Sequence, residues 1–341
     1  MGKASRREFI KKLLALPPLL GIGIKRRGAN TFSFPIAQTP PSTPTAGKSR
    51  VVLVKNARVI DGRNRVNRTV ISKMVNQAVM NLTGKSDPKS AWEMLFSPAD
   101  IVGIKLSCLA GRPLSPKPEL VSAIVSGLTL AGIPEENIIL WERTSRELRR
   151  AGFTIRKSGK GVRCYGTDEE GVGYEDAPRF SGEVGSCFSR ILTERITALI
   201  NLPIVKDHDL AGVSIALKNM FGAIHNPNKY HDNNCDPYIA DLNNHYVIRS
   251  KLKLVVADAL IIQYHGGPSY KPPWAWRYGG IIVSKDPVAV DALGADLIKK
   301  KRKKEGLPSL ADEGRPPKHI KTAASYGLGE ARLDRLEIIR G

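Results

Sequence analysis

Ile101-Val-Gly-Ile-Lys105 is a short apolar run that ends in a lysine, and it opens the pattern on which the fold class rests. A helical pattern follows from Pro118 to Ala131, with proline at its first position and Gly132 just past its end, as is typical of helix termini. The next apolar run is Ile138-Ile-Leu-Trp141. Strand, helix and strand in this order predict a βαβ unit, whose two strands lie parallel in one sheet.

The same alternation continues on both sides of this unit. The predicted strands are residues 51–59, 198–205, 252–257 and 280–283. The predicted helices are residues 69–82, a segment that ends at Arg150, and residues 212–220, 238–250 and 287–304. We therefore expect an α/β fold with a mostly parallel sheet and helices on both faces. Residues 152–189 are Gly-rich and irregular, and they predict an insertion or a functional loop.

The N-terminal 37 residues read as an export signal. Ser5-Arg6-Arg7-Glu8-Phe9 precedes an apolar run over residues 13–24, which is well short of the ~20 residues that span a membrane. The paired arginines resemble a twin-arginine signal, which implies the twin-arginine translocase as a partner and a periplasmic or otherwise exported location. With cleavage expected after Ala37, a Pro/Thr/Ser-rich linker over 38–48 and a single α/β domain over 49–341 follow. We expect no transmembrane span in the mature form.

The formal net charge of +21 does not indicate a nucleic-acid partner. Part of the excess lies in residues 1–37, which export removes, and part in the basic run from Lys299 to Lys304 at the end of a predicted helix. No zinc-finger spacing, RNA-binding aromatic signature or interleaving of basic and aromatic residues is present. We therefore expect no binding to nucleic acid.

The cysteines do not form the local motifs of metal clusters. Cys108, Cys164, Cys187 and Cys235 lie far apart, and none belongs to a C-x-x-C motif. A ferredoxin-type iron–sulfur cluster is therefore not expected. Disulfides, which an oxidising compartment permits, and singly buried thiols both remain open.

Polar residues follow the predicted strands at the points where these strands end. They are Lys105, Glu142, Lys206-Asp-His-Asp209, Asp258 and Lys285-Asp286. Ligands of open parallel sheets bind outside the carboxyl ends of the strands. The sequence therefore predicts a site at this edge, with the polarity of ordinary loops as the alternative explanation.

Most of the histidines fall in one part of the chain. His208, His225 and His231 lie close in sequence to carboxylates such as Asp209, and imidazole with carboxylate is the ligand set of divalent transition metals. Their spacing matches no compact metal motif. Metal ligation by these four residues and ordinary hydrogen bonding by scattered histidines are both kept as interpretations.

Lys218 stands in an otherwise apolar stretch, Ile215-Ala-Leu-Lys-Asn-Met-Phe221. A lysine there must pair with a carboxylate or meet an anionic ligand, because an unpaired buried charge is costly. The segment from Lys206 to Gly222, together with Asp286-Pro-Val-Ala-Val-Asp-Ala292, resembles the domain-of-unknown-function family 362. Some members are fused to iron–sulfur modules, whose cysteine repeats this chain lacks. The resemblance implies positions of interest without roles: Lys105, Lys206, His208, Lys218, Asn219, Asp286 and Asp291.

These observations lead to two functional hypotheses. The first is an exported protein that binds a divalent transition metal or a small anionic molecule at the strand ends, and that acts as an enzyme. Its candidate catalytic residues are Lys105, Lys206, His208, Lys218 and Asp286. Its candidate cofactor-binding residues are Asn219, Asp258 and Asp291. The second hypothesis is a non-catalytic periplasmic binding protein or cofactor carrier.

Overall fold

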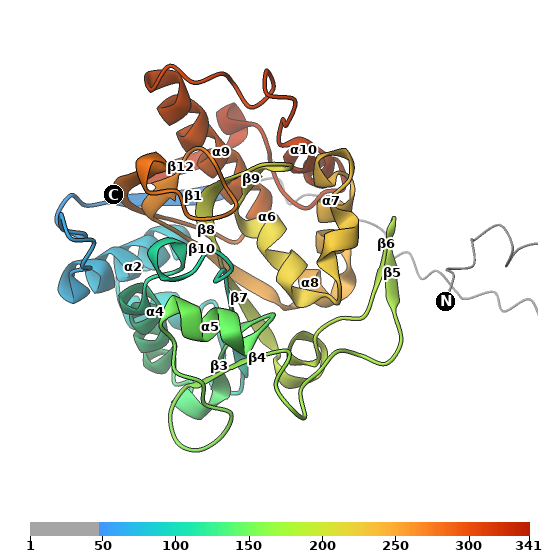
Figure 1. Cartoon of the computed structure of the whole chain (residues 1–341). Coiled ribbons are helices and arrows are strands. Elements are labelled where there is room, and N and C mark those ends of the chain that lie inside the picture. Colours follow the sequence, from blue (N-terminus) through green and yellow to red (C-terminus); the bar gives the residue numbers. More distant parts are fainter. Residues whose placement is uncertain (1–47) are drawn as a thin grey trace, which may run out of the picture. The chain divides into compact units, whose positions relative to one another are not determined.

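A ten-stranded sheet runs through residues 48–341, which are the residues that the computed structural model describes (Figure 1). The expected signal in residues 1–37 and nearly all of the expected linker lie outside the described residues. The strand order is β12-β1-β11-β10-β7-β2-β3-β4, with β8 paired to β10 and β9 paired to β8. The strands of this sheet are β1 (Arg50–Lys55), β2 (Val102–Leu106), β3 (Ile138–Glu142), β4 (Arg163–Gly166), β7 (Ala198–Leu202), β8 (Ile204–His208), β9 (Gly212–Ser214), β10 (Leu252–Gln263), β11 (Ala275–Ser284) and β12 (Glu337–Arg340).

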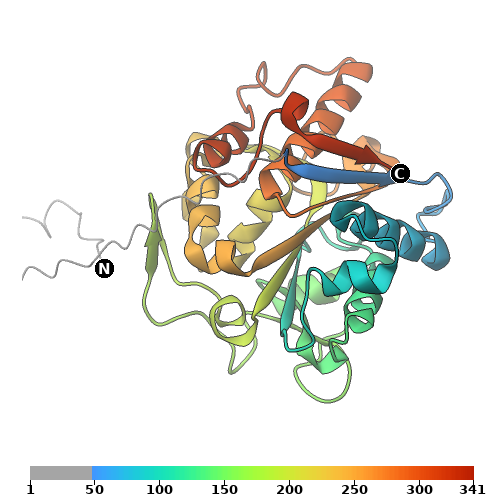
Figure 2. The ribbon, with the colours of Figure 1, turned by 180° about the vertical axis from the view of Figure 1, so that it is seen from behind.

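Most neighbouring strands of the sheet are parallel, which confirms the predicted fold class. The βαβ unit around β2 and β3 is parallel, and β2 and β10 both pair in parallel with β7. The antiparallel pairs are those of β11 with β1 and β10, and of β8 with β9. The last strand, β12, returns to lie parallel beside β1, and Figure 2 shows the two strands side by side.

Helices cover both faces of the sheet. One face carries α2 (Arg68–Thr83), α3 (Pro88–Glu93), α4 (Pro118–Leu130) and α5 (Ser145–Ala151). The other face carries α6 (Ala216–Asn219), α7 (Tyr238–Asn244), α8 (Tyr246–Lys251), α9 (Pro287–Lys304) and α10 (Lys318–Ser325). Within residues 48–341, no helix is both long enough and apolar enough to cross a membrane.

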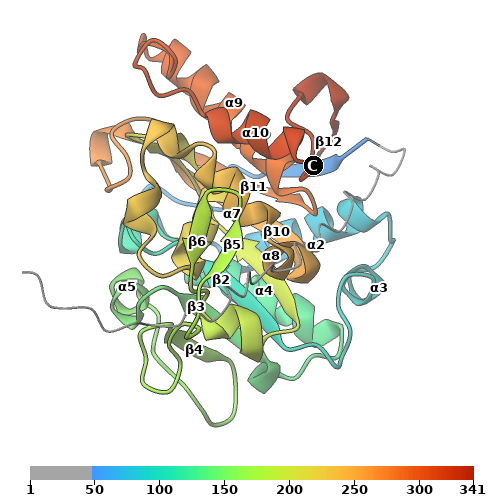
Figure 3. The same ribbon diagram turned by 90° about the vertical axis from the view of Figure 1, so that its right-hand side faces the viewer.

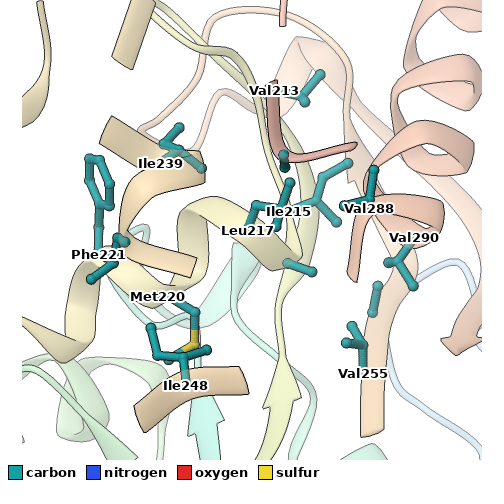
Figure 4. Close-up of a cluster of buried hydrophobic side chains, with 14 of the residues drawn as sticks. Val213, Ile215, Leu217, Met220, Phe221, Ile239, Ile248, Val255, Val288 and Val290 are labelled. Carbon is teal, nitrogen blue, oxygen red and sulfur yellow. The ribbon is translucent and has the colours of Figure 1, made fainter. Parts of the chain in front are cut away.

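Two hydrophobic cores lie on the two sides of the sheet, because successive side chains of a strand point to opposite faces. In β1, Val51 and Leu53 belong to the core beneath α6 to α10, whereas Val52 and Val54 belong to the core beneath α2 to α5. Figure 4 shows part of the first core, where residues of α6, α7 and α8 meet those of α9 and β10. Burial on both faces explains why the strands are apolar runs without alternation in the sequence.

The predicted strand over 198–205 is in fact two strands, and the break between them positions the site. β7 ends at Leu202, which lies opposite Leu106 at the end of β2. After Pro203 the chain continues as β8, which pairs with β10 on one side and turns back through β9 on the other. β8 therefore continues past the ends of β2 and β3, and its polar residues lie near the carboxyl ends of those two strands.

Three further segments differ from the prediction. Residues 212–214 form β9 instead of the start of a helix, and the predicted helix over 238–250 is divided into α7 and α8 at His245. The imidazole of His245 accepts a hydrogen bond from the backbone N–H of Val247 and so caps α8. The predicted insertion supplies β4 to the sheet and an antiparallel ribbon of β5 (Arg179–Ser181) and β6 (Val184–Ser186), which lies against α7 (Figure 3).

Candidate functional site

A pocket of about 320 Å³ lies where β2, β3 and β8 end. Its wall includes Lys105 from β2, Glu142 from β3, Lys206 from β8 and Lys218 from α6. The predicted site residues that line it are Lys105, Lys206, His208, Asp209, Lys218, Asn219 and His231. The parallel strands bring these residues together because their carboxyl ends meet at one edge of the sheet.

Lys105 is held in place by a buried ion pair. Its ammonium Nζ lies 2.6 Å from Oε1 of Glu142 and donates to the backbone carbonyl of Leu106, also at 2.6 Å. The second carboxylate oxygen of Glu142 accepts a hydrogen bond from the backbone N–H of Cys108 at 3.0 Å. All these groups are buried, so the pair forms a rigid, electrically compensated floor of the pocket.

Asn219 and Gly222 fit closely against this ion pair. The side-chain amide of Asn219 donates to the backbone carbonyl of Lys105 at 3.2 Å and to Oδ1 of Asn201 at 2.7 Å. A Cβ at Gly222 would lie 2.7 Å from both Nζ of Lys105 and Oε1 of Glu142. Glycine is therefore needed where the backbone passes over the pair.

Lys206 is buried in the same pocket without a carboxylate partner. Only 2% of the residue is exposed, and no carboxylate of residues 48–341 lies within ion-pair distance of its Nζ. Its one hydrogen bond within the described part of the chain goes to the backbone carbonyl of Pro268, at 3.3 Å. Burial, reinforced by the positive charge of Lys218, lowers the pKa of Lys206 to about 8.

Lys218 is also buried in the pocket, and the hydrogen-bond partner of its ammonium group is an imidazole. Its Nζ lies 3.1 Å from Nε2 of His231 and 4.2 Å from the centre of the Phe221 ring. Burial lowers the pKa of Lys218 to about 8, against the smaller opposing effects of Cys235 and Asp209.

The tautomer of His231 follows from its hydrogen bonds. Its Nδ1 lies 3.1 Å from the carbonyl oxygen of Pro227 and 3.2 Å from that of Asn228, so Nδ1 carries the proton and donates. Nε2 is then free to accept a hydrogen bond from Lys218. Burial and the charge of Lys218 lower the pKa of His231, which keeps the ring neutral.

His208 presents a neutral imidazole to the pocket. The backbone N–H groups of Leu210 and Ala211 both donate to its Nδ1, at 3.2 and 3.3 Å. Nδ1 is thus an acceptor, although a carboxylate oxygen of Asp209 lies 3.0 Å from it, and Nε2 carries the proton. Burial, with the charges of Lys218 and Lys206, lowers the pKa of His208 to about 2.

The four predicted metal ligands do not form one cluster. The rings of His208 and His231 are stacked with their centroids 6.0 Å apart, and Asp209 lies beside them. His225 is exposed, packs edge-on against the Tyr174 ring and does not line the pocket. Across residues 48–341, no group of three or more His, Cys, Asp or Glu side chains is arranged to hold a metal ion. The metal site stays a prediction.

Three predicted carboxylates bind backbone amides and do not line the pocket. Asp258 accepts from the N–H groups of Lys117 and Leu260, at 3.0 and 2.8 Å. Asp286 caps α9 by accepting from Ala289 at 2.9 Å. Asp291 accepts from Ala216 at 2.6 Å and from Leu217 at longer range. Each of these carboxylates stabilises the fold around the site, and burial raises the pKa of all three.

The four cysteines are unpaired thiols. Cys108, Cys164 and Cys235 are buried, and burial raises the pKa of Cys164 to about 12. Burial also raises the pKa of Cys108 and Cys235. These thiols therefore behave as small apolar side chains in the core.

The site also contains residues that were not singled out from the sequence as candidates. Arg143 and Glu147 line the pocket and form an ion pair with an N–O distance of 3.2 Å. Asn201 orients Asn219 from beneath. Arg143 directly follows β3, which is the signal that locates it, whereas Asn201 lies inside an apolar strand and offers no such signal.

Comparison with known proteins identifies a family and similar solved structures. The family model described as "Domain of unknown function (DUF362)" matches residues 102–296, a range that contains the pocket residues named above. A protein from Thermotoga maritima of known crystal structure is 10% identical, with a TM-score of 0.37, and the match covers 69% of this chain. This chain spans 59% of that protein. No curated protein matches the sequence.

Proposed function

This chain belongs to the DUF362 family, and we propose that its pocket at the strand ends binds a small organic anion, such as a carboxylate or a phosphate ester. One observation carries the proposal: Lys206 and Lys218 are both buried in one pocket, and neither has a carboxylate within ion-pair distance among residues 48–341. A buried ammonium group without a counter-charge is costly, and an anionic ligand removes that cost.

The rest of the pocket supports binding of an anion more than binding of a cation. Glu142 is compensated by Lys105 and Glu147 by Arg143, and Asp209 is largely exposed, so none of these carboxylates offers a cation a buried, uncompensated charge. His208 has its Nδ1 occupied by backbone N–H groups, which leaves Nε2–H as a neutral donor. A ligand in the pocket therefore meets two ammonium groups and an imidazole N–H, which is a set of donors suited to oxygen anions.

Binding calorimetry with matched small molecules tests this proposal. We expect inorganic phosphate, lactate and succinate to bind to the full chain, and the neutral analogue lactamide not to bind. Lys206→Met and Lys218→Met should each weaken anion binding about tenfold or more, because each removes a charge-assisted hydrogen bond of roughly 1.5–3 kcal/mol. Lys299→Gln, which changes an exposed lysine of α9, is the matched control.

Two results would contradict the proposal. One is equal binding of lactate and lactamide, and the other is anion binding that both lysine variants leave unchanged. Circular dichroism and thermal unfolding of each variant establish that the fold is retained. Anion binding is common to an enzyme and to a non-catalytic carrier, and turnover of a bound anion would distinguish the enzyme from the carrier.

We also propose that the protein is exported by the twin-arginine route, on the basis of Ser5-Arg6-Arg7-Glu8-Phe9 and the apolar run after it. Fusion of residues 1–48 to a reporter that is active only after folded export tests this. Replacement of Arg6 and Arg7 together by lysine should abolish reporter activity outside the cytoplasm. Replacement of Arg26 and Arg27, which follow the apolar run, is the control and should leave export unchanged.

A further inference from the structure

The buried and half-buried lysines of this protein differ in how many hydrogen bonds their ammonium groups donate. This difference separates structural lysines from a reactive one. An ammonium group can donate three hydrogen bonds. Lys251, which is half-buried, donates to three backbone carbonyls, at 2.7, 2.8 and 3.1 Å. Lys105 donates to a carboxylate, a carbonyl and a side-chain amide. These two lysines are held in place by the fold.

Lys206 and Lys218 are held by fewer hydrogen bonds than these two lysines, and the more weakly held of the pair is Lys206. Among residues 48–341, its Nζ makes one hydrogen bond, to the carbonyl of Pro268 at 3.3 Å, and the side chain lines the pocket. Lys218 is held more firmly, by His231 at 3.1 Å and by the face of the Phe221 ring. The amine of Lys206 is therefore the one that is both confined to the pocket and free to reach a ligand.

The surroundings of Lys206 favour its uncharged form. The residue is 2% exposed, and the second cation, Lys218, lines the same pocket. A lysine that is desolvated or placed beside another cationic group acts as a nucleophile toward carbonyl compounds. Lys105, whose charge is paired with Glu142, has no such role.

We propose that Lys206 forms an imine with a small 2-oxo carboxylate, whose carboxylate group is bound by Lys218. This inference rests on the proposed anion binding and adds the class of ligand and the covalent step. The neutral amine attacks the carbonyl carbon, and the nitrogen loses a proton as the carbonyl oxygen becomes a hydroxyl group. That hydroxyl takes up a proton and leaves as water, so that one C=N bond and one water molecule replace the amine and the C=O bond.

Neighbouring side chains supply the proton transfers that this step needs. The hydroxyl group must be protonated before it leaves, and the ammonium group of Lys218 is an acid that lines the pocket, whereas Nε2–H of the neutral His208 donates a hydrogen bond without giving up its proton. The proton that the attacking nitrogen loses returns Lys218 to its ammonium form, from which Nε2 of His231 again accepts a hydrogen bond. The pocket therefore contains a nucleophile, Lys206, and a cation, Lys218, that binds the carboxylate of the ligand and donates a proton.

Reductive trapping tests the proposal directly. The full chain is incubated with pyruvate and sodium cyanoborohydride, and the product is analysed by intact mass spectrometry and peptide mapping. We expect one adduct, on Lys206, with the added mass of the oxo acid less its carbonyl oxygen. Lys206→Met and Lys206→Arg should lose this adduct, Lys218→Met should reduce its yield, and Lys299→Gln should leave it unchanged.

A competition experiment on the unaltered protein keeps the test independent of how the variants fold. Lactate, which has the carboxylate but no carbonyl group, should protect Lys206 from pyruvate and form no adduct itself. An adduct that maps to another lysine, or that spreads over exposed lysines to the same extent in Lys206→Met, would overturn the imine. If pyruvate and lactate both bind but no adduct forms, the imine is refuted and anion binding stands. If neither binds, the proposed function itself is refuted.

Discussion

Nζ of Lys105 and Oε1 of Glu142 lie 2.6 Å apart in an ion pair whose side chains are 1% and 6% exposed. The pair joins the ends of β2 and β3, and it forms the floor of the pocket. Lys206 and Lys218 line the same pocket without such a partner. The contrast between one compensated lysine and two uncompensated ones is the main electrostatic feature of the site.

Removing one member of the Lys105–Glu142 pair should destabilise the protein strongly. Lys105→Met or Glu142→Leu leaves an uncompensated buried charge, and we expect the free energy of unfolding to fall by roughly 3–5 kcal/mol. The double variant should recover much of this loss, because two apolar side chains replace two charges. Urea unfolding measures all three variants. The exposed pair Lys89–Glu93 is the control, since Lys89→Met should cost less than about 1 kcal/mol.

The ligand-free protein should become more stable as the pH rises from about 8 toward 10.5. The pKa of Lys206 is lowered from 10.5 to about 8, and so is that of Lys218. Between these values the unfolded state binds more protons than the folded state, so stability rises with pH. Replacing both lysines by methionine should flatten this part of the stability profile relative to Lys299→Gln. An unchanged slope would show that the two lysines are not desolvated.

Acidification should destabilise the protein through His208. Its pKa is lowered from 6.5 to about 2, so the unfolded state takes up a proton below 6.5 and the folded state does not. Stability is therefore lost as the pH falls below 6.5. His208→Gln should reduce this loss of stability, measured by thermal unfolding between about pH 7 and about pH 4. His225→Gln, at an exposed position, should leave the profile unchanged.

Asp291 should be important for folding and not for ligand contact. Asp291→Ala removes the acceptor of the N–H groups of Ala216 and Leu217, and leaving these two buried groups unpaired costs roughly 2–5 kcal/mol in total. Urea unfolding measures this loss. Asp296→Ala, on the same helix but in a surface pair with Lys300, should change stability by less than about 1 kcal/mol. Equal effects of the two substitutions would contradict the assignment.

The fold class and most elements were predictable because they depend on local patterns. The βαβ unit, α9 and the mostly parallel sheet follow from apolar runs and from helix-end residues such as Pro118 and Asp286. The helix predicted from Gly212 was wrong over its first three residues, because pairing of β9 with β8 overrides local propensity. The break at Pro203, which positions β8, also results from tertiary pairing.

The candidate site was predictable in part. Lys105, Lys206 and His208 stand at strand ends, and parallel strands bring such positions together whatever their distance in the sequence. Asp258 follows the predicted strand over 252–257 but lies inside β10, which continues to Gln263, and Asp286 follows β11; both bind backbone amides and not the pocket. Each of these carboxylates binds one local N–H group, of Leu260 or Ala289, and one from a distant segment, of Lys117 or Glu330. The sequence does not place the distant N–H groups, which fix the orientation of the carboxylates away from the pocket.

The sequence by itself determined which side chains are available and that parallel strands would end in lysines, histidines and carboxylates. Only the tertiary structure decided how the charges are compensated: it pairs Lys105 with Glu142 and leaves Lys206 and Lys218 without carboxylates. The physical reason is that the pKa and the reactivity of an amine depend on its burial and on the groups within a few ångströms of it. Those neighbours come from other elements of the chain: Glu142 is 37 residues from Lys105, and Pro268 is 62 residues from Lys206.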